Sequence, residues 1–131
     1  MIYHGYFRSS SSYRFRLAFA LKGITPDFRS VHLVRNGGEQ RSAASVSLNP
    51  QALVPTLEVD GETLTQSPAI LEWLEETHPE PPLLPKRATL RAHVRAFCAA
   101  IAGEIHPLQN LRVLQFIEAN YAQDAQGKEA W

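Results

Sequence analysis

The sequence predicts an α/β domain with a mixed β-sheet, followed by a helical segment. Strand-like and helix-like stretches follow one another in the order β-α-β-α-β-β-α over the first part of the chain. The dipeptide Asp60-Gly61 lies between two alternating stretches and is a strong signal for a tight hairpin. Beyond Leu90, apolar residues recur in steps of three and four, the spacing of one helix face. We therefore expect an α/β domain over residues 1–79, a linker over 80–87 and a helical segment over 88–131.

The first strand and helix are expected at the N-terminus. Ile2–Tyr6 is short and aromatic, as in a β-strand. Ser9–Ser12 follow, and serine is a preferred N-cap because its hydroxyl accepts an unpaired N–H of the first helical turn. Tyr13–Lys22 has the composition of a helix, and Gly23 stands where a C′ glycine is expected.

A second strand and a short helix come next. We expect the strand over Asp27–Leu33, a loop over Val34–Gly38 and the helix over Glu39–Leu48. Asn49-Pro50 ends that helix, because the residue before a proline avoids the helical conformation.

Two hairpin strands, Thr56–Val59 and Glu62–Thr65, lead to a third helix. The pair Ser67-Pro68 favours a helix start with the serine as N-cap and the proline in the first helical position. The helix is expected to stop near Thr77, before Pro79.

The linker over residues 80–87 is rich in proline. Pro107 is expected to kink the helical segment that follows. Cys98 lies on this segment and is expected to be buried, since free cysteine usually is. The apolar helix face comprises Leu90, Val94, Phe97, Ile101, Ile105 and Leu108, continues through Leu111, Leu114 and Ile117, and fades over residues 123–128.

Composition limits the classes of function. The chain has 131 residues, of which 44% are apolar, and its 13 basic residues balance 13 acidic ones. A neutral chain lacks the basic surface that nucleic acids and anionic membranes require. No apolar run reaches the roughly 18–20 residues of a membrane span, and the N-terminus does not resemble a secretory signal. We therefore expect a cytoplasmic protein without nucleic-acid or membrane partners.

Cysteine and histidine usage argues against disulfide and metal chemistry. The single cysteine, Cys98, excludes an intramolecular disulfide and a CxxC redox pair. The five histidines are scattered without the spacing of metal ligands, so no metal site is expected.

The serines at the start of the first helix are candidate functional residues. Hydroxyls, unpaired N–H groups and the positive end of the helix dipole converge there, which favours a bound anion. Such a site also lowers the pKa of a thiol and so favours the nucleophilic thiolate. The alternative is that one serine caps the helix and the others face solvent.

Two further features belong to the same predicted end of the sheet. A cis peptide bond at Val54-Pro55 would turn the Val54 backbone outward, where an extended peptide could pair with it; the alternative is an ordinary trans turn. Gln66-Ser67 lies at a strand-to-helix junction and would suit a carboxylate; the alternative is a simple helix cap. The two junctions with Val54-Pro55 between them form a stronger signal than any of them alone.

An ordered set of motifs resembles one known family. Four stretches are similar to successive segments of the zeta-class glutathione transferases, the maleylacetoacetate isomerases. They are Tyr6–Arg16 with its serine run, Leu48-Asn49-Pro50 with Val54-Pro55-Thr56-Leu57, Gln66–Glu76, and Ile101–Leu111. The resemblance covers essentially the whole chain. It implies a thioredoxin-like domain that binds glutathione, followed by the start of an all-α domain.

The resemblance also implies residue roles. The cysteine of glutathione would pair with Val54 before a cis Pro55, and its γ-glutamyl end would bind around Gln66 and Ser67. Ser9, Ser10 and Ser11 would be the catalytic residues that assist the thiolate, with Ser11 standing where many members have cysteine. The remaining implied glutathione-binding residues are Ser12, Tyr13, Arg14, Gln40 near the glycine end, and His106, Asn110 and Arg112 from the helical domain.

The function implied by the resemblance is glutathione-dependent cis–trans isomerisation of maleylacetoacetate, in tyrosine and phenylalanine catabolism, by a homodimer. Arg8 and Arg14 flank the serines and are candidate partners for the two carboxylates of the keto-acid substrate; the alternative is that they are solvated surface arginines. The helical domain of the family continues beyond the position of Trp131, so a C-terminally truncated member is expected. The alternatives are maleylpyruvate isomerisation, a glutathione-binding fragment without turnover, and a structural fragment completed by a partner chain.

Overall fold

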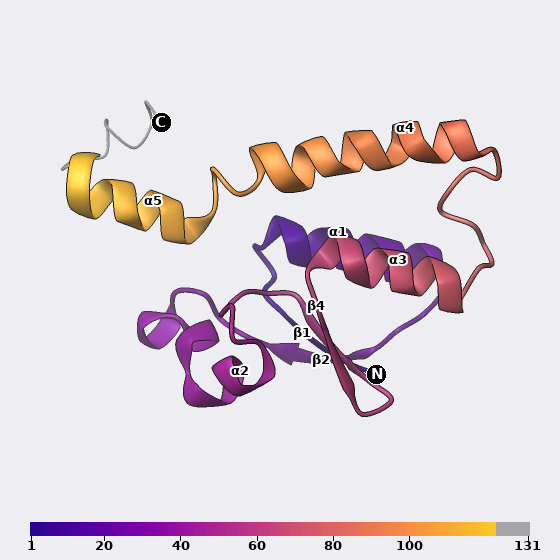
Figure 1. Ribbon diagram of the computed structural model, residues 1–131. Coiled ribbons are helices and arrows are strands. Elements are labelled where there is room, and N and C mark those ends of the chain that lie inside the picture. Colours follow the sequence, from indigo (N-terminus) through magenta and orange to yellow (C-terminus); the bar gives the residue numbers. More distant parts are fainter. Residues whose placement is uncertain (123–131) are drawn as a thin grey trace. The chain divides into compact units, whose positions relative to one another are not determined.

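The computed structural model describes residues 1–122. The chain divides into two compact units, Met1–Leu84 and Pro85–Trp131, and each unit has its own architecture (Figure 1).

The first unit has the predicted order of elements. Its mixed sheet has the strand order β2-β1-β3-β4, in which β1 runs parallel to β2 and antiparallel to β3, and β3 pairs antiparallel with β4. The elements are β1 (Ile2–Gly5), α1 (Ser10–Leu21), β2 (Asp27–Ser30), α2 (Ala43–Leu48), β3 (Thr56–Val59), β4 (Glu62–Thr65) and α3 (Ser67–Thr77).

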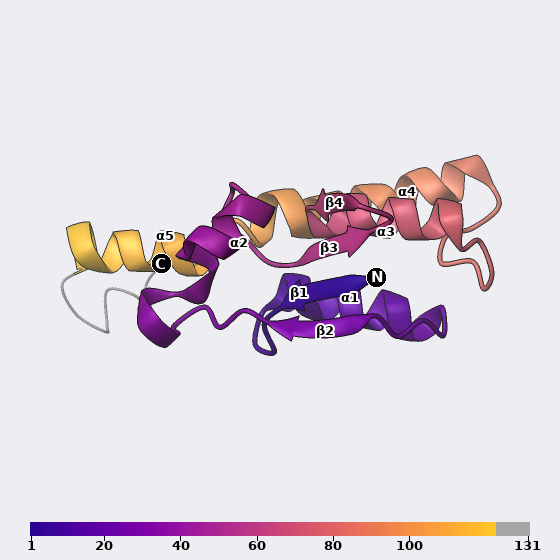
Figure 2. The ribbon, with the colours of Figure 1, turned by 90° about the horizontal axis from the view of Figure 1, so that it is seen from below.

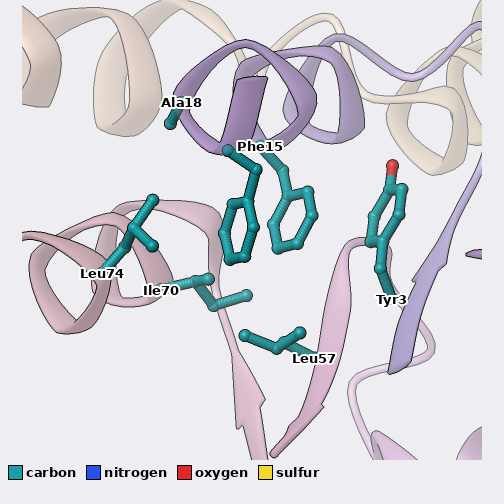
Figure 3. Close-up of a cluster of buried hydrophobic side chains, with 7 residues drawn as sticks. Tyr3, Phe15, Ala18, Leu57, Ile70 and Leu74 are labelled. Carbon is teal, nitrogen blue, oxygen red and sulfur yellow. The ribbon is translucent and has the colours of Figure 1, made fainter. Parts of the chain in front are cut away.

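The hydrophobic core lies between the sheet and helices α1 and α3, which lie side by side over one face of the sheet (Figures 1 and 2). The rings of Tyr3 and Phe15 stack with their centroids 4.1 Å apart. Figure 3 shows Phe15 and Ala18 from α1 and Ile70 and Leu74 from α3, gathered with Tyr3 from β1 and Leu57 from β3. Burial of these large apolar side chains is the main favourable contribution to the stability of this unit.

The hairpin between β3 and β4 confirms the prediction from Asp60-Gly61. Both residues have positive φ, 51° and 81°, as a type I′ turn requires. The glycine adopts this conformation without a steric penalty, and aspartate is among the residues that tolerate it best.

The segment between β2 and β3 differs from the prediction. Strand β2 ends at Ser30. The N–H of Val31 still donates to the Gly5 carbonyl of β1 at 2.9 Å, but the N–H of His32 leaves the sheet and donates to the Glu39 carboxylate at 2.7 Å. The helix expected over Glu39–Leu48 is broken at Ser42, which has extended ψ and separates a 3₁₀ turn from α2. The hydroxyl of Ser42 accepts the N–H of Ser45 and so starts a new helix within the predicted one.

A buried ion pair joins the C-terminal ends of α1 and α3. The ammonium group of Lys22, whose side chain is fully buried, donates to the Glu75 carboxylate at 2.6 Å and to the Pro81 carbonyl at 2.7 Å. The Glu75 carboxylate also accepts the N–H groups of Leu83 and Leu84 at 3.0–3.1 Å. These bonds attach residues 81–84 to the first unit.

Several influences act on the pKa of Glu75. Burial is the largest of them and raises the pKa, but the hydrogen bonds from Lys22 and from two backbone N–H groups, together with the charge of Lys22, outweigh it. The net result is a pKa below the ordinary value of a glutamate, so the carboxylate is ionised at neutral pH.

The second unit is helical in its described part. It comprises α4 (Ala88–Ala99), the π-helical segment η3 (Ala100–Ile105), α5 (Leu111–Ile117) and the π-helical segment η4 (Glu118–Ala122). Pro107 ends the first helix instead of kinking it, because proline has no N–H to continue the ladder, and a new helix starts at Asn110. The fading of the apolar pattern over residues 123–128 lies outside the described residues.

The expected burial of Cys98 is wrong, because its side chain is exposed. Neither α4 nor α5 buries any side chain, so within residues 1–122 these helices do not enclose the thiol. Among the described residues, no helix combines the length and the apolar character needed to cross a membrane.

Candidate functional site

The junction between β1 and α1 carries the first three serines. Ser9 is the N-cap of α1, and its hydroxyl accepts the N–H of Ser12 at 3.2 Å. Ser10 and Ser11 occupy the first turn; Ser10 is exposed and Ser11 half-buried. The positive end of a 12-residue helix therefore lies beside surface hydroxyls, which favours an anion such as a thiolate.

Ser12, which is also predicted to bind glutathione, is not part of this surface. Its side chain is fully buried, and its hydroxyl accepts the N–H of Tyr6 at 3.2 Å. Its carbonyl accepts the hydroxyl of Tyr3 at 3.3 Å. Because Ser12 accepts hydrogen bonds from the Tyr6 N–H and the Tyr3 hydroxyl, it stabilises the connection between β1 and α1.

Two neighbouring residues complete the first junction. The guanidinium of Arg16 donates to the carbonyls of Tyr6 and Phe7 at 3.4 and 3.2 Å, which fastens the loop that leads to Ser9. The same guanidinium lies 5.5 Å from the ring centroid of Tyr13, whose side chain is exposed.

The Val54-Pro55 bond is cis, as predicted. The preceding carbonyl, that of Leu53, accepts the side-chain amide of Asn49 at 2.9 Å, which holds the loop from inside. Within residues 1–122, no hydrogen bond uses the N–H or the carbonyl of Val54 itself. Both groups are therefore available to an extended peptide.

The junction between β4 and α3 differs from the predicted cap. Gln66, not Ser67, is the N-cap residue, with φ 65° and ψ 108°, and its side chain does not cap the helix. Its amide nitrogen instead donates to the side-chain oxygen of Gln51 at 2.7 Å. A positive φ costs a non-glycine residue about 1–3 kcal/mol, and such strain is concentrated at ligand-binding sites.

Ser67 connects this junction to α1. Only 4% of Ser67 is exposed, and its hydroxyl oxygen accepts the guanidinium of Arg14 at 2.9 Å. A hydroxyl that accepts from a cation keeps its own hydrogen to donate, and a carboxylate is the strongest acceptor for it. The Arg14–Ser67 bond therefore brings a hydroxyl donor and a positive charge to the N-terminus of α3.

Gln40 also lies at this side of the unit. It is 92% buried, its side-chain oxygen has no hydrogen-bond partner in the described part of the chain, and its nitrogen makes only a long contact of 3.5 Å with the Leu33 carbonyl. Gln40 and Val54 line a common cavity of about 10 Å³, the size of one water molecule. A buried acceptor without a donor is costly, which suits a position completed by a ligand or by water.

The remaining predicted residues belong to the second unit. Asn110 caps α5, since its side-chain oxygen accepts the N–H of Arg112 at 3.1 Å. His106 is half-buried and Arg112 exposed. Among the described residues, no group of three histidine, cysteine, aspartate or glutamate side chains could hold a metal ion.

Gln51 is the residue at this site that the sequence did not single out. It lies in the turn that follows Asn49-Pro50, and its bond to Gln66 spans 15 positions of the sequence. The only local signal is a polar side chain shortly before Val54-Pro55, which does not identify its partner.

Comparison with known proteins identifies the domain. Residues 8–77 match the family model of the glutathione S-transferase N-terminal domain. The chain is 47% identical over 130 residues to the maleylacetoacetate isomerase of Dictyostelium discoideum, an alignment that covers 99% of this chain and 59% of that protein. It is 41% identical over 128 residues to the maleylpyruvate isomerase of a Ralstonia species, covering 98% of this chain and 59% of that protein.

Comparison with solved structures gives the same family relationship. A bacterial zeta-class maleylpyruvate isomerase in its holo form matches with a TM-score of 0.94 and 41% identity, over 100% of this chain and 61% of that one. A maleylacetoacetate isomerase from Methylobacterium extorquens with bound malonate and glutathione matches with a TM-score of 0.89 and 37% identity, over 99% of this chain and 60% of that one.

The chain thus spans about three fifths of the length of these relatives. The predicted thioredoxin-like domain with a mixed four-stranded sheet and following helices is confirmed. The chain belongs to the glutathione S-transferase family, in its zeta class of maleylacetoacetate isomerases.

Proposed function

We propose that the first unit binds glutathione, and that the protein uses it to catalyse the cis–trans isomerisation of maleylacetoacetate. The observation that carries the proposal is the hydrogen bond between Arg14 and Ser67. It links the second turn of α1 to the first residue of α3, so a position that favours a thiolate and a position that favours a carboxylate lie near each other toward the positive ends of two helices.

The residues present fit the parts of glutathione. Ser67 and Gln66 offer a hydroxyl donor and an amide to the γ-glutamyl end. Val54 offers its backbone N–H and carbonyl to the central cysteine residue. Gln40, whose side-chain oxygen has no hydrogen-bond partner among the described residues, lines the same cavity as Val54. Ser9, Ser10 and Ser11 lie at the N-terminus of α1, where the helix dipole and hydroxyl donors lower the pKa of a thiol.

The chemistry follows from this arrangement. Bound glutathione supplies the thiolate that adds to the conjugated double bond and leaves after the single bond has rotated. The serines of α1 stabilise the negative charge on sulfur before addition and after departure. Arg8, exposed beside the serine run, offers a positive charge to a carboxylate of the keto acid.

The family relationship extends the proposal beyond the first unit. Tyr13 lies at the edge of the serine junction and is included among the glutathione contacts, as are His106, Asn110 and Arg112 of the second unit. A place in tyrosine and phenylalanine catabolism, a homodimeric state and a cytoplasmic location rest on that relationship alone.

Maleylpyruvate isomerisation is the second candidate. It is favoured by the 41% identity to the Ralstonia maleylpyruvate isomerase and by the TM-score of 0.94 to a zeta-class enzyme of that activity. The two substrates share the maleyl group and differ in the length of the keto acid, so the same thiolate chemistry serves both.

An isomerase assay with each substrate tests the proposal. We expect turnover that requires glutathione and is absent when glutathione is omitted. Preference for maleylpyruvate would support the second candidate. Glutathione binding without turnover of either substrate would leave a binding module and contradict the isomerase proposal.

A titration of the bound thiol tests the role of the serines separately. The thiolate absorbance of bound glutathione should report a pKa below that of the free thiol, about 8.5. Replacing Ser9 and Ser10 together by alanine should raise that pKa. An unchanged titration would remove both serines from the mechanism.

A further inference from the structure

Two glutamine side chains are hydrogen-bonded to each other at the candidate site. The amide nitrogen of Gln66, at the start of α3, donates to the side-chain oxygen of Gln51 at 2.7 Å. Gln51 is held in turn, since its backbone N–H donates to the side-chain oxygen of Asn49 at 3.1 Å. The Asn49 side chain also donates to the Leu53 carbonyl, so the turn that carries Gln51 has a fixed conformation.

This contact determines which end of the Gln66 amide is presented to a ligand. A glutamine amide has a donor end and an acceptor end, and the two lie on opposite sides of the group. Because the NH₂ group of Gln66 is directed at Gln51, its oxygen is directed away from Gln51. Gln66 therefore presents an acceptor.

The neighbouring residue has the opposite polarity. The hydroxyl oxygen of Ser67 accepts from Arg14, so its hydrogen remains as a donor. An acceptor and a donor on adjacent residues match the two charged groups of an α-amino acid, with the ammonium group on Gln66 and the carboxylate on Ser67.

We propose that Gln51 is a positioning residue that makes the site selective for a free α-ammonium group. The proposal rests on the proposed glutathione binding and deepens it. Gln51 touches Gln66 and acts through it, by keeping the Gln66 oxygen turned toward the γ-glutamyl ammonium group of the ligand.

A purely structural role for Gln51 would have a different signature. The bond between Gln51 and Gln66 is exposed, so it competes with water and contributes little to folding. Its loss should therefore leave stability nearly unchanged and alter only the discrimination between ligands with and without the amino group.

The test measures the affinity of the 131-residue chain for two ligands by calorimetry. One ligand is reduced glutathione, and the other is its analogue in which hydrogen replaces the γ-glutamyl amino group. The variants are Gln51→Met, which keeps the length of the side chain and removes the acceptor, and Gln51→Glu, which keeps an acceptor. Gln115→Met, at an exposed position of α5, is the control. Thermal unfolding of each variant checks that the fold is retained.

The native chain should bind glutathione more tightly than the analogue. Gln51→Met should reduce this preference about five- to tenfold, the effect of losing one hydrogen bond between neutral groups such as the bond that orients Gln66, with little change in the affinity for the analogue. Gln51→Glu should retain the preference, because a carboxylate also holds the NH₂ end of Gln66, and Gln115→Met should behave as the native chain.

The outcomes separate this inference from the proposed function. A native chain that binds neither ligand would overturn both. A native chain that prefers glutathione, together with an equal preference in Gln51→Met, would overturn the role of Gln51 and leave glutathione binding intact. Loss of the preference in Gln51→Glu would also overturn it, because an acceptor at this position would then be insufficient.

Discussion

Helices α1 and α3 are bridged at both ends, and the two bridges differ. Near the C-terminal ends, Lys22 and Glu75 form an ion pair in which the lysine also meets the Pro81 carbonyl and the carboxylate also meets two backbone N–H groups. Near the N-terminal ends, Arg14 donates to Ser67, whose hydroxyl hydrogen remains to donate. The C-terminal bridge is complete within the fold, whereas the N-terminal bridge has a donor left for a ligand.

The difference shows how one pair of helices serves stability and binding. The Lys22 side chain is fully buried and that of Glu75 is 17% exposed, so the C-terminal bridge is sheltered from water and acts on the fold. The N-terminal bridge lies where both helix dipoles are positive and where anions are favoured. Changes at the C-terminal bridge should alter stability, and changes at the N-terminal bridge should alter glutathione affinity.

The largest expected effect comes from breaking the C-terminal bridge. Lys22→Met leaves the Glu75 carboxylate without its cation, which should lower the free energy of unfolding by about 3 kcal/mol. Glutathione affinity of the folded variant should not change. Urea unfolding measures the first quantity, and Lys86→Met, the same substitution at an exposed lysine, is the control. Equal stability of the two variants would contradict a structural role for the bridge.

Ser67→Ala should have the next largest effect, on binding. It removes the hydroxyl proposed to donate to the γ-glutamyl carboxylate, which should weaken glutathione binding by about 1–3 kcal/mol. Calorimetry measures the loss, with Ser47→Ala at an exposed position of α2 as the control. If Ser67→Ala bound glutathione as tightly as the Ser47→Ala control, the donor would have been assigned to the wrong residue.

Ser12→Ala should separate the buried serine from its neighbours. It leaves the buried N–H of Tyr6 without an acceptor, which should destabilise the fold by about 1–2 kcal/mol. The thiol pKa of bound glutathione should stay unchanged, in contrast to the Ser9 and Ser10 variant. A shifted thiol pKa in Ser12→Ala would show that this serine reaches the ligand after all.

Gln66→Gly should have opposite effects on stability and binding. Glycine relieves the positive φ of residue 66, which should stabilise the fold by about 1 kcal/mol, while loss of the amide weakens glutathione binding. Ala69→Gly, at an exposed position inside α3, should instead destabilise the fold by a similar amount. Thermal unfolding of both variants tests whether the positive φ of Gln66 destabilises the fold. A loss of stability in Gln66→Gly would contradict backbone strain at this residue.

The smallest expected effect is on pH dependence. The pKa of Glu75 is lowered in the folded state, so the unfolded chain binds the proton more readily. The stabilisation is complete above the ordinary glutamate pKa of about 4.3 and is lost as the pH falls through the lowered value. Glu75→Gln should weaken the dependence of the free energy of unfolding on pH in the acid range, as measured by urea unfolding. If the pH dependence of Glu75→Gln in the acid range equalled that of the native chain, the protons taken up on acid unfolding would belong to groups other than Glu75.

The features that could be predicted from the sequence are those set by neighbouring residues. Asp60-Gly61 determines its turn through its own backbone preferences, and the helix starts near Ser9 follow from short-range capping. The ordered motifs also identified the family, because each lies at a fixed place relative to the next along the chain.

The features that could not be predicted depend on partners far away in the sequence. The four consecutive serines look alike, and only the N–H of Tyr6 decides that Ser12 points inward. Ser67 looked like a helix cap, but its partner is Arg14, 53 positions earlier, and the cap position belongs to Gln66. Cys98 has an apolar neighbourhood in sequence, yet α4 buries no side chain.

The central claim is that glutathione binds at the N-terminal turns of α1 and α3 and at Val54. Backbone amide NMR shifts of the isotope-labelled chain, followed during titration with reduced glutathione, test it most directly. The account predicts the largest shifts together at Ser9–Ser11, Val54 and Gln66–Ser67, and small shifts at the C-terminal bridge around Glu75. Shifts absent up to millimolar glutathione, or clustered at the C-terminal bridge, would contradict it.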